Sequence, residues 1–394
     1  MAARDGFEVD GSGVQVGILS DSFNRDSASD TNFSADVASG DLPGPGNPCG
    51  YASPVQVLDD PAGGGEDEGR AMAQIVHDLA PGASLTFASA FGGEPAFAEN
   101  IEKLGEAGAK VIADDVFYPE EPFFQDGPVA VAVNEVVEHG ATYLSAAGND
   151  NLIDGKGRDI ASWEAPHFRD SGSCPPHVVA LSEEIEGVEG AGTGLRPEHC
   201  MDFNPGPADD ETFGIVVSKG ATLVADLQWA EPWNGVKSDL DAFLLNSGGE
   251  VIEQSLKDNS SNSGTQKPFE EVEWENKTGA AATVSLVINR YSGSKAAPLK
   301  FALLENGGGV TATQYPESSG GDTVGPTIFG HSGSAEAVSV AAAPYFDSEE
   351  PEYYSSRGPV THYYGPVVGP APAEQLPSPE VVAKPNVTAT DGGA

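Results

Sequence analysis

Three polar residues in this sequence of 394 residues could do chemistry together: two carboxylates, which can act as acid or base, and one amide, which can donate hydrogen bonds. Asp21 follows the apolar run Val14–Leu19, Glu68 opens a helical pattern, and Asn149 follows a further apolar run. Active sites of α/β proteins gather at the carboxyl ends of their strands. Two carboxylates within hydrogen-bond reach cannot both ionise cheaply, so an Asp21–Glu68 pair would share a proton, and its glutamate could act as a base at mildly acidic pH.

Each of the three residues also has a purely structural interpretation. An aspartate commonly caps a strand-to-loop turn, a glutamate at a helix start is favoured by the helix dipole, and asparagine is common in turns. For Glu68 the catalytic and the structural interpretations both stay open.

The elements that must position these residues alternate over the first 150 residues. Apolar runs at 14–19, 55–58, 84–90, 110–117 and 141–147 predict strands, and amphipathic patterns at 67–79, 97–107 and 128–139 predict helices. Such alternation is typical of a doubly wound α/β domain with a parallel sheet.

The pattern changes between about 198 and 306. Short alternating segments at 213–217, 221–229, 240–245, 272–274, 282–289 and 299–304 are separated by turn residues, which predicts an all-β sandwich inserted into the α/β domain. The α/β pattern returns at 326–332 and 337–343, and the proline-rich tail to Ala394 is predicted to be loop. We therefore expect an α/β domain from 1–165 and 311–394, an irregular connection at 166–197 and the sandwich at 198–310.

The charge balance is strongly acidic, with 61 Asp and Glu against 19 Lys and Arg and a net charge of −42. A surface this negative would repel phosphate, so we expect neither nucleic acid nor an anionic membrane surface as a partner. The acids are spread along the whole chain, which favours an adaptation of solubility, such as life in high salt, over steering of cationic substrates.

The sequence shows no run of about 18 apolar residues, so no membrane span is expected. The first residues, MAARDGFEVDGSG, lack the apolar core of a secretory signal. Cys174 and Cys200 lie in one irregular region and could pair, which would leave Cys49 over. Three separate thiols are the alternative, and the count does not fix the redox compartment.

Four pieces of the sequence, in this order and at these distances, resemble the subtilisin-like serine peptidases, or subtilases. They are Val16-Gly-Ile-Leu-Ser-Asp21, Glu68-Gly-Arg-Ala-Met-Ala with Ala80-Pro-Gly-Ala83, Ser145-Ala-Ala-Gly-Asn149, and Ser355-Ser-Arg-Gly-Pro359 with Lys384-Pro-Asn-Val387. Within the inserted segment, Asp239-Leu-Asp241 and the apolar run after it resemble a strand of the pre-peptidase C-terminal modules of secreted enzymes.

The resemblance implies that Asp21 is the triad aspartate and that Asn149 is the oxyanion-hole donor. The family has a histidine base where this chain has Glu68, and a glutamate base resembles the related sedolisins. Sedolisins take their second carboxylate from one turn further along the same helix, where this chain has Met72, so Asp21 and Glu68 would form a hybrid pair. His77 lies about 13 Å further along the helix by its rise and cannot replace the base.

The resemblance also implies a substrate-binding edge. A peptide would pair with the strand at 110–117 through its backbone, near Asp115 and Val116 of that strand and near Ala147 and Gly148 after the next one. Asp115 could favour basic side chains or act on Glu68, and a solvated acidic residue is the alternative interpretation. Ser355 and Ser356 belong to a turn that is structural in the family, so we do not expect either to be the nucleophile.

The family continues this tail into a Gly-Thr-Ser-x-Ala-x-Pro helix start that carries the nucleophile, and the 394 residues contain no such segment. We expect peptide-bond hydrolysis by a serine nucleophile in the full-length parent and no activity in this chain as it stands. A catalytically dead peptidase fold that serves as a binding or adhesion module is the alternative. The resemblance implies a secreted or cell-surface parent, a protein or peptide substrate and a monomer. No metal ligand or cofactor is predicted, and a structural calcium ion is compatible with the resemblance.

Overall fold

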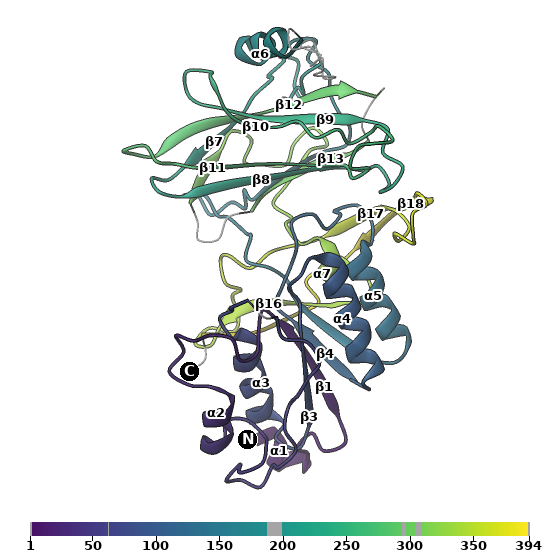
Figure 1. Cartoon of the computed structure of the whole chain (residues 1–394). Coiled ribbons are helices and arrows are strands. Elements are labelled where there is room, and N and C mark those ends of the chain that lie inside the picture. The colour runs from purple at the N-terminus through teal and green to yellow at the C-terminus, as the bar shows by residue number, and fades with distance from the viewer. Residues whose placement is uncertain (1, 62, 187–198, 294–296, 305–308, 393–394) are drawn as a thin grey trace. The chain divides into compact units, whose positions relative to one another are not determined.

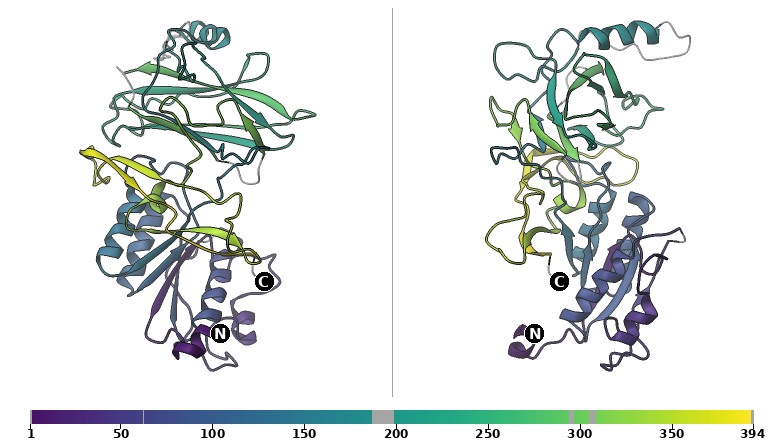
Figure 2. Two further views of the ribbon diagram at one scale, coloured as in Figure 1. Left: turned by 180° about the vertical axis from the view of Figure 1, so that it is seen from behind. Right: turned by 90° about the vertical axis from the view of Figure 1, so that its left-hand side faces the viewer.

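The computed structural model (Figures 1 and 2) describes residues 2–61, 63–186, 199–293, 297–304 and 309–392. The chain divides into two compact units. The first comprises Met1–Glu121, Asp126–Ala146 and Gly330–Val340, and the second comprises Pro122–Gln125, Ala147–Phe329 and Ala341–Ala394.

The first unit is built on a parallel sheet. Its strands are β1 (Gln15–Ser20), β2 (Gln56–Val57), β3 (Ser84–Ser89), β4 (Val111–Asp114), β5 (Thr142–Ala146) and the start of β16 (Val338–Pro344). They lie in the order β16-β5-β4-β1-β3-β2, and every pairing in this order is parallel. Strand β16 continues into the second unit, where β19 (Val387–Asp391) takes the outer place in the sheet order.

Helices cover both faces of this sheet, because alternate residues of its strands point to opposite sides. Val16 and Ile18 of β1 share a core with Ala73 of α3 (Glu68–Leu79). On the other face, Leu19 shares a core with apolar residues of α4 (Glu94–Glu106) and α5 (Pro128–Glu138). Shorter helices are α1 (Ala2–Phe7), α2 (Phe33–Ser39) and α7 (Gly330–Gly333). The predicted doubly wound α/β class is confirmed.

The second unit is an all-β sandwich with a hairpin beside it. One antiparallel sheet has the order β10-β9-β12-β7-β14 and the other has the order β11-β8-β13-β6-β15. The strands are β6 (Ser162–Ala165), β7 (Phe213–Val217), β8 (Thr222–Trp229), β9 (Asp239–Leu245), β10 (Val251–Ser255), β11 (Phe269–Glu275), β12 (Ala282–Ser292), β13 (Leu299–Leu304), β14 (Val310–Thr313) and β15 (Thr323–Val324). Strands β17 (Val360–Tyr364) and β18 (Gln375–Val382) form the hairpin.

The sandwich core is aromatic. Trp163 stacks on Phe301 with ring centroids 5.8 Å apart, and Phe213 meets Phe301 edge-on at 4.9 Å. These rings come from strands of both sheets, and each is almost fully buried. Buried aromatic side chains supply large apolar areas, so this cluster explains how the short strands form a stable layer pair.

The sandwich extends beyond its predicted limits. Strands β6 and β15 lie outside the expected 198–310 segment, and β6 pairs with β13. Helix α6 (Pro176–Glu186) lies in the stretch that was predicted to be irregular. Residues 187–198 of that stretch, and 305–308 beside the expected boundary at 310, lie outside the described residues.

The prediction that the tail is loop was wrong, since β17, β18 and β19 lie there. Two prolines in β18 hid its pattern. Proline is tolerated in a strand where its missing N–H is not needed, as at the edge of a two-stranded hairpin.

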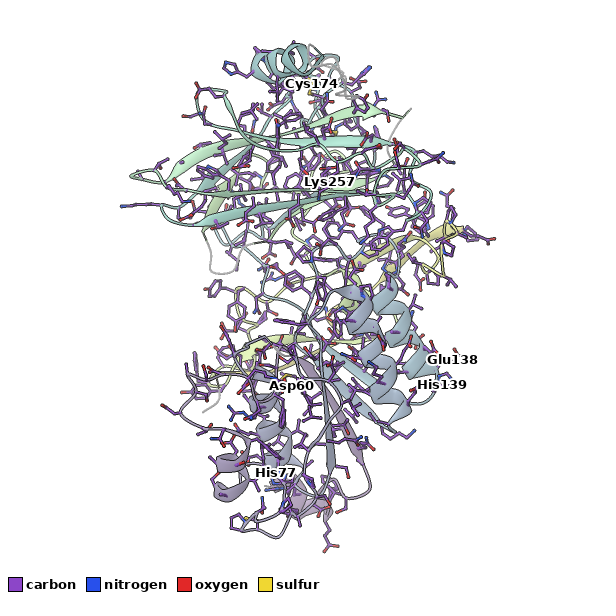
Figure 3. The ribbon with its side chains drawn as sticks, in the orientation of Figure 1. Asp60, His77, Glu138, His139, Cys174 and Lys257 are labelled. Atoms are coloured by element: carbon purple, nitrogen blue, oxygen red, sulfur yellow. A yellow bond between two sulfur atoms is a disulfide. The ribbon has the colours of Figure 1, made fainter. Side chains whose placement is uncertain are left out.

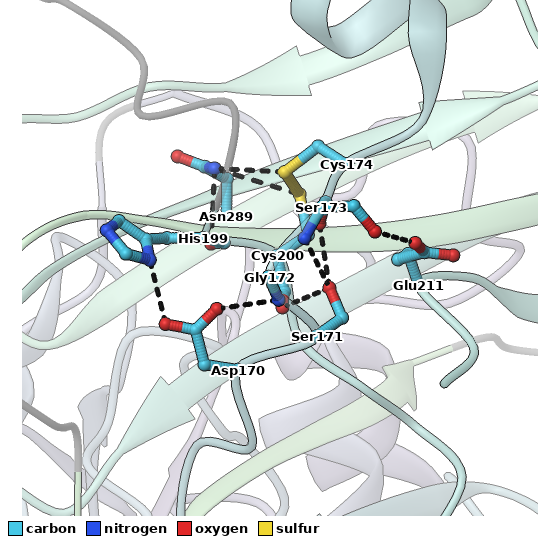
Figure 4. Close-up of a disulfide and its surroundings, with 9 residues drawn as sticks. All are labelled: Asp170, Ser171, Gly172, Ser173, Cys174, His199, Cys200, Glu211 and Asn289. Atoms are coloured by element: carbon cyan, nitrogen blue, oxygen red, sulfur yellow. Dashed lines mark hydrogen bonds and ion pairs between the residues drawn. A yellow bond between two sulfur atoms is a disulfide. The ribbon is translucent and has the colours of Figure 1, made fainter. Parts of the chain in front are cut away.

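Of the two alternatives that the sequence left open, the structure has the disulfide, in which Cys174 and Cys200 are bonded with Cα atoms 5.2 Å apart (Figure 4). Cys49 is a free, exposed thiol. Among the helices that the structure describes, none has the length and hydrophobicity to cross a bilayer.

Candidate active site

The carboxyl end of β1 and the start of α3 come together in the first unit because glycine allows it. A Cβ atom added at Gly69 would lie 2.2 Å from the ring of Phe87 and 2.9 Å from the carbonyl oxygen of Ser22. Atoms cannot approach this closely, so any other residue at position 69 would push the helix away from the strands. The approach places Asp21 and Glu68 next to each other in space, as the sequence predicted.

Asp21 binds the backbone at the start of α3. Its Oδ1 accepts a hydrogen bond from the Glu68 backbone N–H at 3.0 Å. Its Oδ2 accepts from the Glu66 backbone N–H at 2.5 Å and from the Ser22 hydroxyl at 2.9 Å. The first N–H groups of a helix have no partner within the helix, so a carboxylate here satisfies them and also complements the helix dipole. Asp21 therefore fixes the position of Glu68 through its backbone.

Glu68 is exposed, and its carboxylate points to a serine. Its Oε2 accepts a hydrogen bond from the Ser20 hydroxyl at 2.8 Å. In the described part of the chain no hydrogen bond joins the carboxyl groups of Glu68 and Asp21. Both oxygens of Asp21 accept hydrogen bonds from backbone or hydroxyl donors, and the proton shared between Asp21 and Glu68 stays a prediction.

Asp115 brings a third carboxylate to this region. It follows β4, which pairs with β1 so that Asp114 lies opposite Leu19. Burial, and then the negative charges of Glu68 and Asp114, raise the pKa of Asp115 to about 6. The residue as a whole is exposed, so solvent screens part of this effect. Val116 beside it is half-buried and packs against the core under α4 and α5.

The remaining predicted site residues lie in the second unit. Asn149 is exposed, and its side chain makes no hydrogen bond to a described residue, so its amide is available to a ligand. Ala147 is buried, and Gly148 has φ +97°, which favours glycine. A Cβ atom there would also lie 3.0 Å from the Ser356 hydroxyl oxygen. Ser356 in turn accepts a hydrogen bond from the Asp150 backbone N–H at 3.0 Å.

Ser355 and Ser356 are both buried and hold backbone groups, since the Ser355 hydroxyl accepts from the Ala342 N–H at 3.1 Å. This geometry agrees with the interpretation of Ser355 and Ser356 as structural residues of a turn. His77 is buried in the last turn of α3 against the ring of Tyr51, and burial lowers the pKa of its imidazole. Both observations fit a core histidine.

Sequence reasoning missed a buried polar cluster at the ends of β4 and β5. His331 of α7 binds Glu121 through Nδ1 at 2.9 Å and lies 3.0 Å from the Ser145 hydroxyl through Nε2. The Ser145 hydroxyl also donates to Asp114 at 2.9 Å. Burial alone would lower the pKa of His331, but the charges of Glu121 and Asp114 outweigh it and raise the pKa to about 10.

This His331 cluster has the residue types of a nucleophile, a base and an acid, yet all of its members are buried. A protonated imidazole cannot accept the serine proton, and no substrate reaches a buried hydroxyl. The cluster therefore positions the ends of β4 and β5. A histidine in the apolar segment at 326–332 was the signal in the sequence that could have revealed it.

Arg70 is a buried cation at the start of α3. It lies in the first turn of α3, which Glu68 begins, and it forms ion pairs with Asp36 and with Asp67, the latter at 3.0 Å. It also donates to the Phe23 carbonyl oxygen at 3.1 Å. Arg70 thus fastens the segment after β1 to the start of α3.

No protein-family model and no curated protein matches this chain. Among solved structures, the CspB protease of Clostridium perfringens is similar over 99% of this chain and 77% of its own, with 10% identity and a TM-score of 0.46. The PatG macrocyclase in complex with peptide is similar over 38% of this chain and 55% of its own, with 13% identity and a TM-score of 0.23. Both TM-scores are below 0.5, so neither likeness enters the arguments below.

Proposed function

We propose that this chain carries part of the active site of a serine-type endopeptidase, in which Glu68 is the general base. The observation that carries the proposal is the arrangement in the first unit, where Glu68 begins a helix at the carboxyl end of β1, is exposed, and lies near Asp115. Asp21 acts as a positioning residue, since it binds the Glu68 backbone. Asn149 is proposed as the oxyanion donor on the basis of its motif and its exposed amide.

The substrate class is a protein or peptide. The strand end at Asp115 and Val116, together with Ala147 and Gly148, would bind its backbone, as an extended peptide adds to a sheet edge. The nucleophile is a serine in a Gly-Thr-Ser-x-Ala-x-Pro segment, which these 394 residues do not contain. The chain by itself is therefore expected to lack activity.

A binding module with a peptidase fold is the second candidate, and one observation favours it. Asp21 uses both carboxylate oxygens for backbone and hydroxyl groups, as a purely structural aspartate would. Under this candidate the strand edge still binds peptide, and no form of the protein cleaves it.

The test compares pH profiles in a form of the protein that carries this chain together with the serine segment. A carboxylate base predicts kcat/KM that persists well below pH 6, where a histidine of ordinary pKa near 6.5 is already protonated. Glu68→Gln should lower kcat/KM by about 10²- to 10⁴-fold, the usual contribution of a general base. Glu66→Gln, an exposed acid two residues away, is the matched control and should retain activity.

Two results would count against this assignment. An acid limb near pH 6.5 or above, or full activity in Glu68→Gln, would mean that another group is the base. Peptide binding without turnover in the serine-containing form would favour the binding module. Casein turnover by the purified 394-residue chain, in a preparation free of host proteases, would contradict the expected inactivity.

A further inference from the structure

Ser20 is a polar residue at the end of an apolar row on β1. Residues two apart on a strand point to the same side, so Ser20 lies on the face of β1 that carries Val16 and Ile18. Those two residues share a core with Ala73 of α3, and Ser20 itself is fully buried, with an exposed fraction of 0%. A buried hydroxyl without a partner costs free energy, so this position requires a hydrogen-bond acceptor.

The acceptor is the carboxylate of Glu68. The Ser20 hydroxyl donates to Glu68 Oε2 at 2.8 Å, and among the described residues this is the one hydrogen bond of the Ser20 side chain. The other carboxylate oxygen, Oε1, accepts no hydrogen bond from a described residue, and Glu68 is exposed. The contact therefore fixes one oxygen of the carboxylate and leaves the other oxygen open.

The backbone holds the two residues at this distance. Ser20 lies opposite Ser89 in the parallel register of β1 and β3, and its carbonyl oxygen accepts from the Ala90 N–H at 2.8 Å. The Glu68 N–H donates to Asp21 Oδ1 at 3.0 Å, so the start of α3 is tied to the residue directly after Ser20. A free glutamate side chain samples many rotamers, and a donor on a fixed strand restricts them. The Ser20 hydroxyl thus selects one orientation of the Glu68 carboxylate.

No cationic side chain performs this task. Within the part of the chain that the structure describes, no ion pair includes Glu68. Arg25, in the segment after β1, pairs with Asp60 at 2.9 Å (Figure 3). Arg70, in the first turn of α3, pairs with other carboxylates. The charge of Glu68 acts on Asp115, which has the same sign. A neutral hydroxyl is therefore the donor that the described residues bring to the Glu68 carboxylate.

We propose that Ser20 is a positioning residue for Glu68, an inference that rests on the proposed function of Glu68 as general base. The hydrogen bond to Oε2 makes Oε1 the oxygen that accepts the proton of the nucleophilic serine. That proton moves while the serine oxygen bonds to the substrate carbonyl carbon, and it later passes to the leaving amine.

A base of this kind needs a third group that holds it in one orientation. Asp21 binds the backbone of Glu68 and makes no hydrogen bond to its carboxylate in the described part of the chain. Ser20 supplies the contact that Asp21 does not make. A hydrogen bond donated to a carboxylate also favours its charged form, which is the form that accepts a proton.

The first test measures kcat and KM as a function of pH in the serine-containing form. Ser20→Ala should lower kcat by roughly tenfold with little change in KM, because the base loses a hydrogen bond to its charged group while the substrate contacts remain. The acid limb of kcat/KM should move to higher pH by on the order of one unit, since the carboxylate loses a donor. Ser20→Thr keeps the hydroxyl and should restore both values.

Ser334→Ala is the matched control. Ser334 is also fully buried in the first unit, and its hydroxyl donates to Asn134 Oδ1 at 2.6 Å, an amide oxygen and not a carboxylate. The control loses a buried hydroxyl of the same size and should keep the wild-type kcat and acid limb. Wild-type kinetics in Ser20→Ala, or an equal loss of kcat in both variants with an unmoved acid limb, would overturn the proposal.

The second test needs no nucleophile, so it separates this inference from the proposed function. In the 394-residue chain, labelled with ¹³C at the glutamate carboxyl carbons, the Glu68 signal is identified by its absence in Glu68→Gln. The pH midpoint of this signal should lie higher in Ser20→Ala than in the wild type and should be unchanged in Ser334→Ala. An unmoved midpoint in Ser20→Ala would refute the role of Ser20, whatever the kinetics show. A moved midpoint without turnover in any serine-containing form would support the action of Ser20 on Glu68 and contradict the proposed function.

Discussion

The two units each bury a group of carboxylates, and they compensate the charge differently. In the first unit, Asp114 and Glu121 share the imidazolium of His331, which lies within 3.3 Å of the one and 2.9 Å of the other. In the second unit, Asp239 and Asp241 on β9 and Glu270 on β11 are also buried, and the charge of the exposed Lys257 acts on Glu270. Buried charges are normally paired. The difference lies in the exposure of the cation, since His331 is buried and Lys257 is exposed.

Other buried carboxylates in the second unit do have buried or half-buried cationic side chains as partners. The way in which the carboxylates on β9 and β11 are paired is therefore not a general property of this unit. Lys300 on β13 is buried, and Glu164 and Asp226 are the carboxylates whose charges act on it. Arg169 forms a two-pronged ion pair with the buried Asp322 at 2.7 and 2.9 Å. The sandwich thus balances carboxylates with side chains elsewhere, and the cluster on β9 and β11 stands out within its own unit.

The largest effect is expected from His331→Gln. This change keeps a polar side chain but leaves Asp114 and Glu121 without a counter-charge, which typically costs about 3–5 kcal/mol of unfolding free energy. Urea unfolding followed by far-UV circular dichroism reports the helices of the first unit. His139→Gln, at the exposed end of α5, is the control and should change little.

The difference in unfolding free energy between the wild type and His331→Gln should also depend on pH. The folded-state pKa of His331 is about 10 against an ordinary 6.5, so its contribution is full below pH 6.5 and is lost as pH rises through 10. The difference in stability between the two proteins should shrink over that interval. A constant difference from pH 6 to 10 would show that the imidazole is not charged in the fold.

A somewhat smaller loss is expected from Lys300→Met in the second unit. The apolar stem is preserved, but Glu164 and Asp226 lose the positive charge between them, which should cost on the order of 3 kcal/mol. Tryptophan fluorescence during urea unfolding measures this, and Lys277→Met on the exposed surface is the matched control. An unchanged or raised midpoint in Lys300→Met would mean that balance by side chains is not what stabilises these clusters.

The sequence predicted the elements of the first unit because their patterns are local. The helix pattern opened by Asp67 and Glu68 corresponds to α3 at Glu68–Leu79, and the alternation of runs predicted the parallel sheet. Adjacent placement of Asp21 and Glu68 could also be predicted, because strand ends and helix starts meet at one edge of such a sheet. The atoms that the two side chains bind could not be predicted. Every non-proline residue has a backbone N–H, and the sequence does not show which of these groups lies near a carboxylate.

The clusters could not be predicted for a similar reason. His331 meets Glu121 and Asp114 across more than 200 positions, and Asp239 meets Glu270 only through the packing of two sheets. A single acidic residue in a chain with net charge −42 has no feature that marks it as buried. The sequence Asp239-Leu-Asp241 was recognised as part of a strand, and nothing in it indicates that both carboxylates are buried.

The smallest effects are expected from the same type of substitution, glutamate to glutamine, made once in each cluster. The two results can therefore be compared directly. Glu121→Gln removes a carboxylate that binds the His331 imidazole and backbone N–H, and hydrogen bonds to charged groups contribute about 1.5–3 kcal/mol each, so stability should fall. Glu270→Gln removes a buried carboxyl group whose pKa burial raises to about 8. At pH 8 the change should leave stability unchanged or raise it by on the order of 1 kcal/mol, since each unit of raised pKa is worth about 1.4 kcal/mol. Urea unfolding of both variants, with tryptophan fluorescence for the sandwich and circular dichroism for the first unit, measures the pair. A loss of stability in Glu270→Gln as large as that in Glu121→Gln would mean that the contrast between the two clusters is wrong.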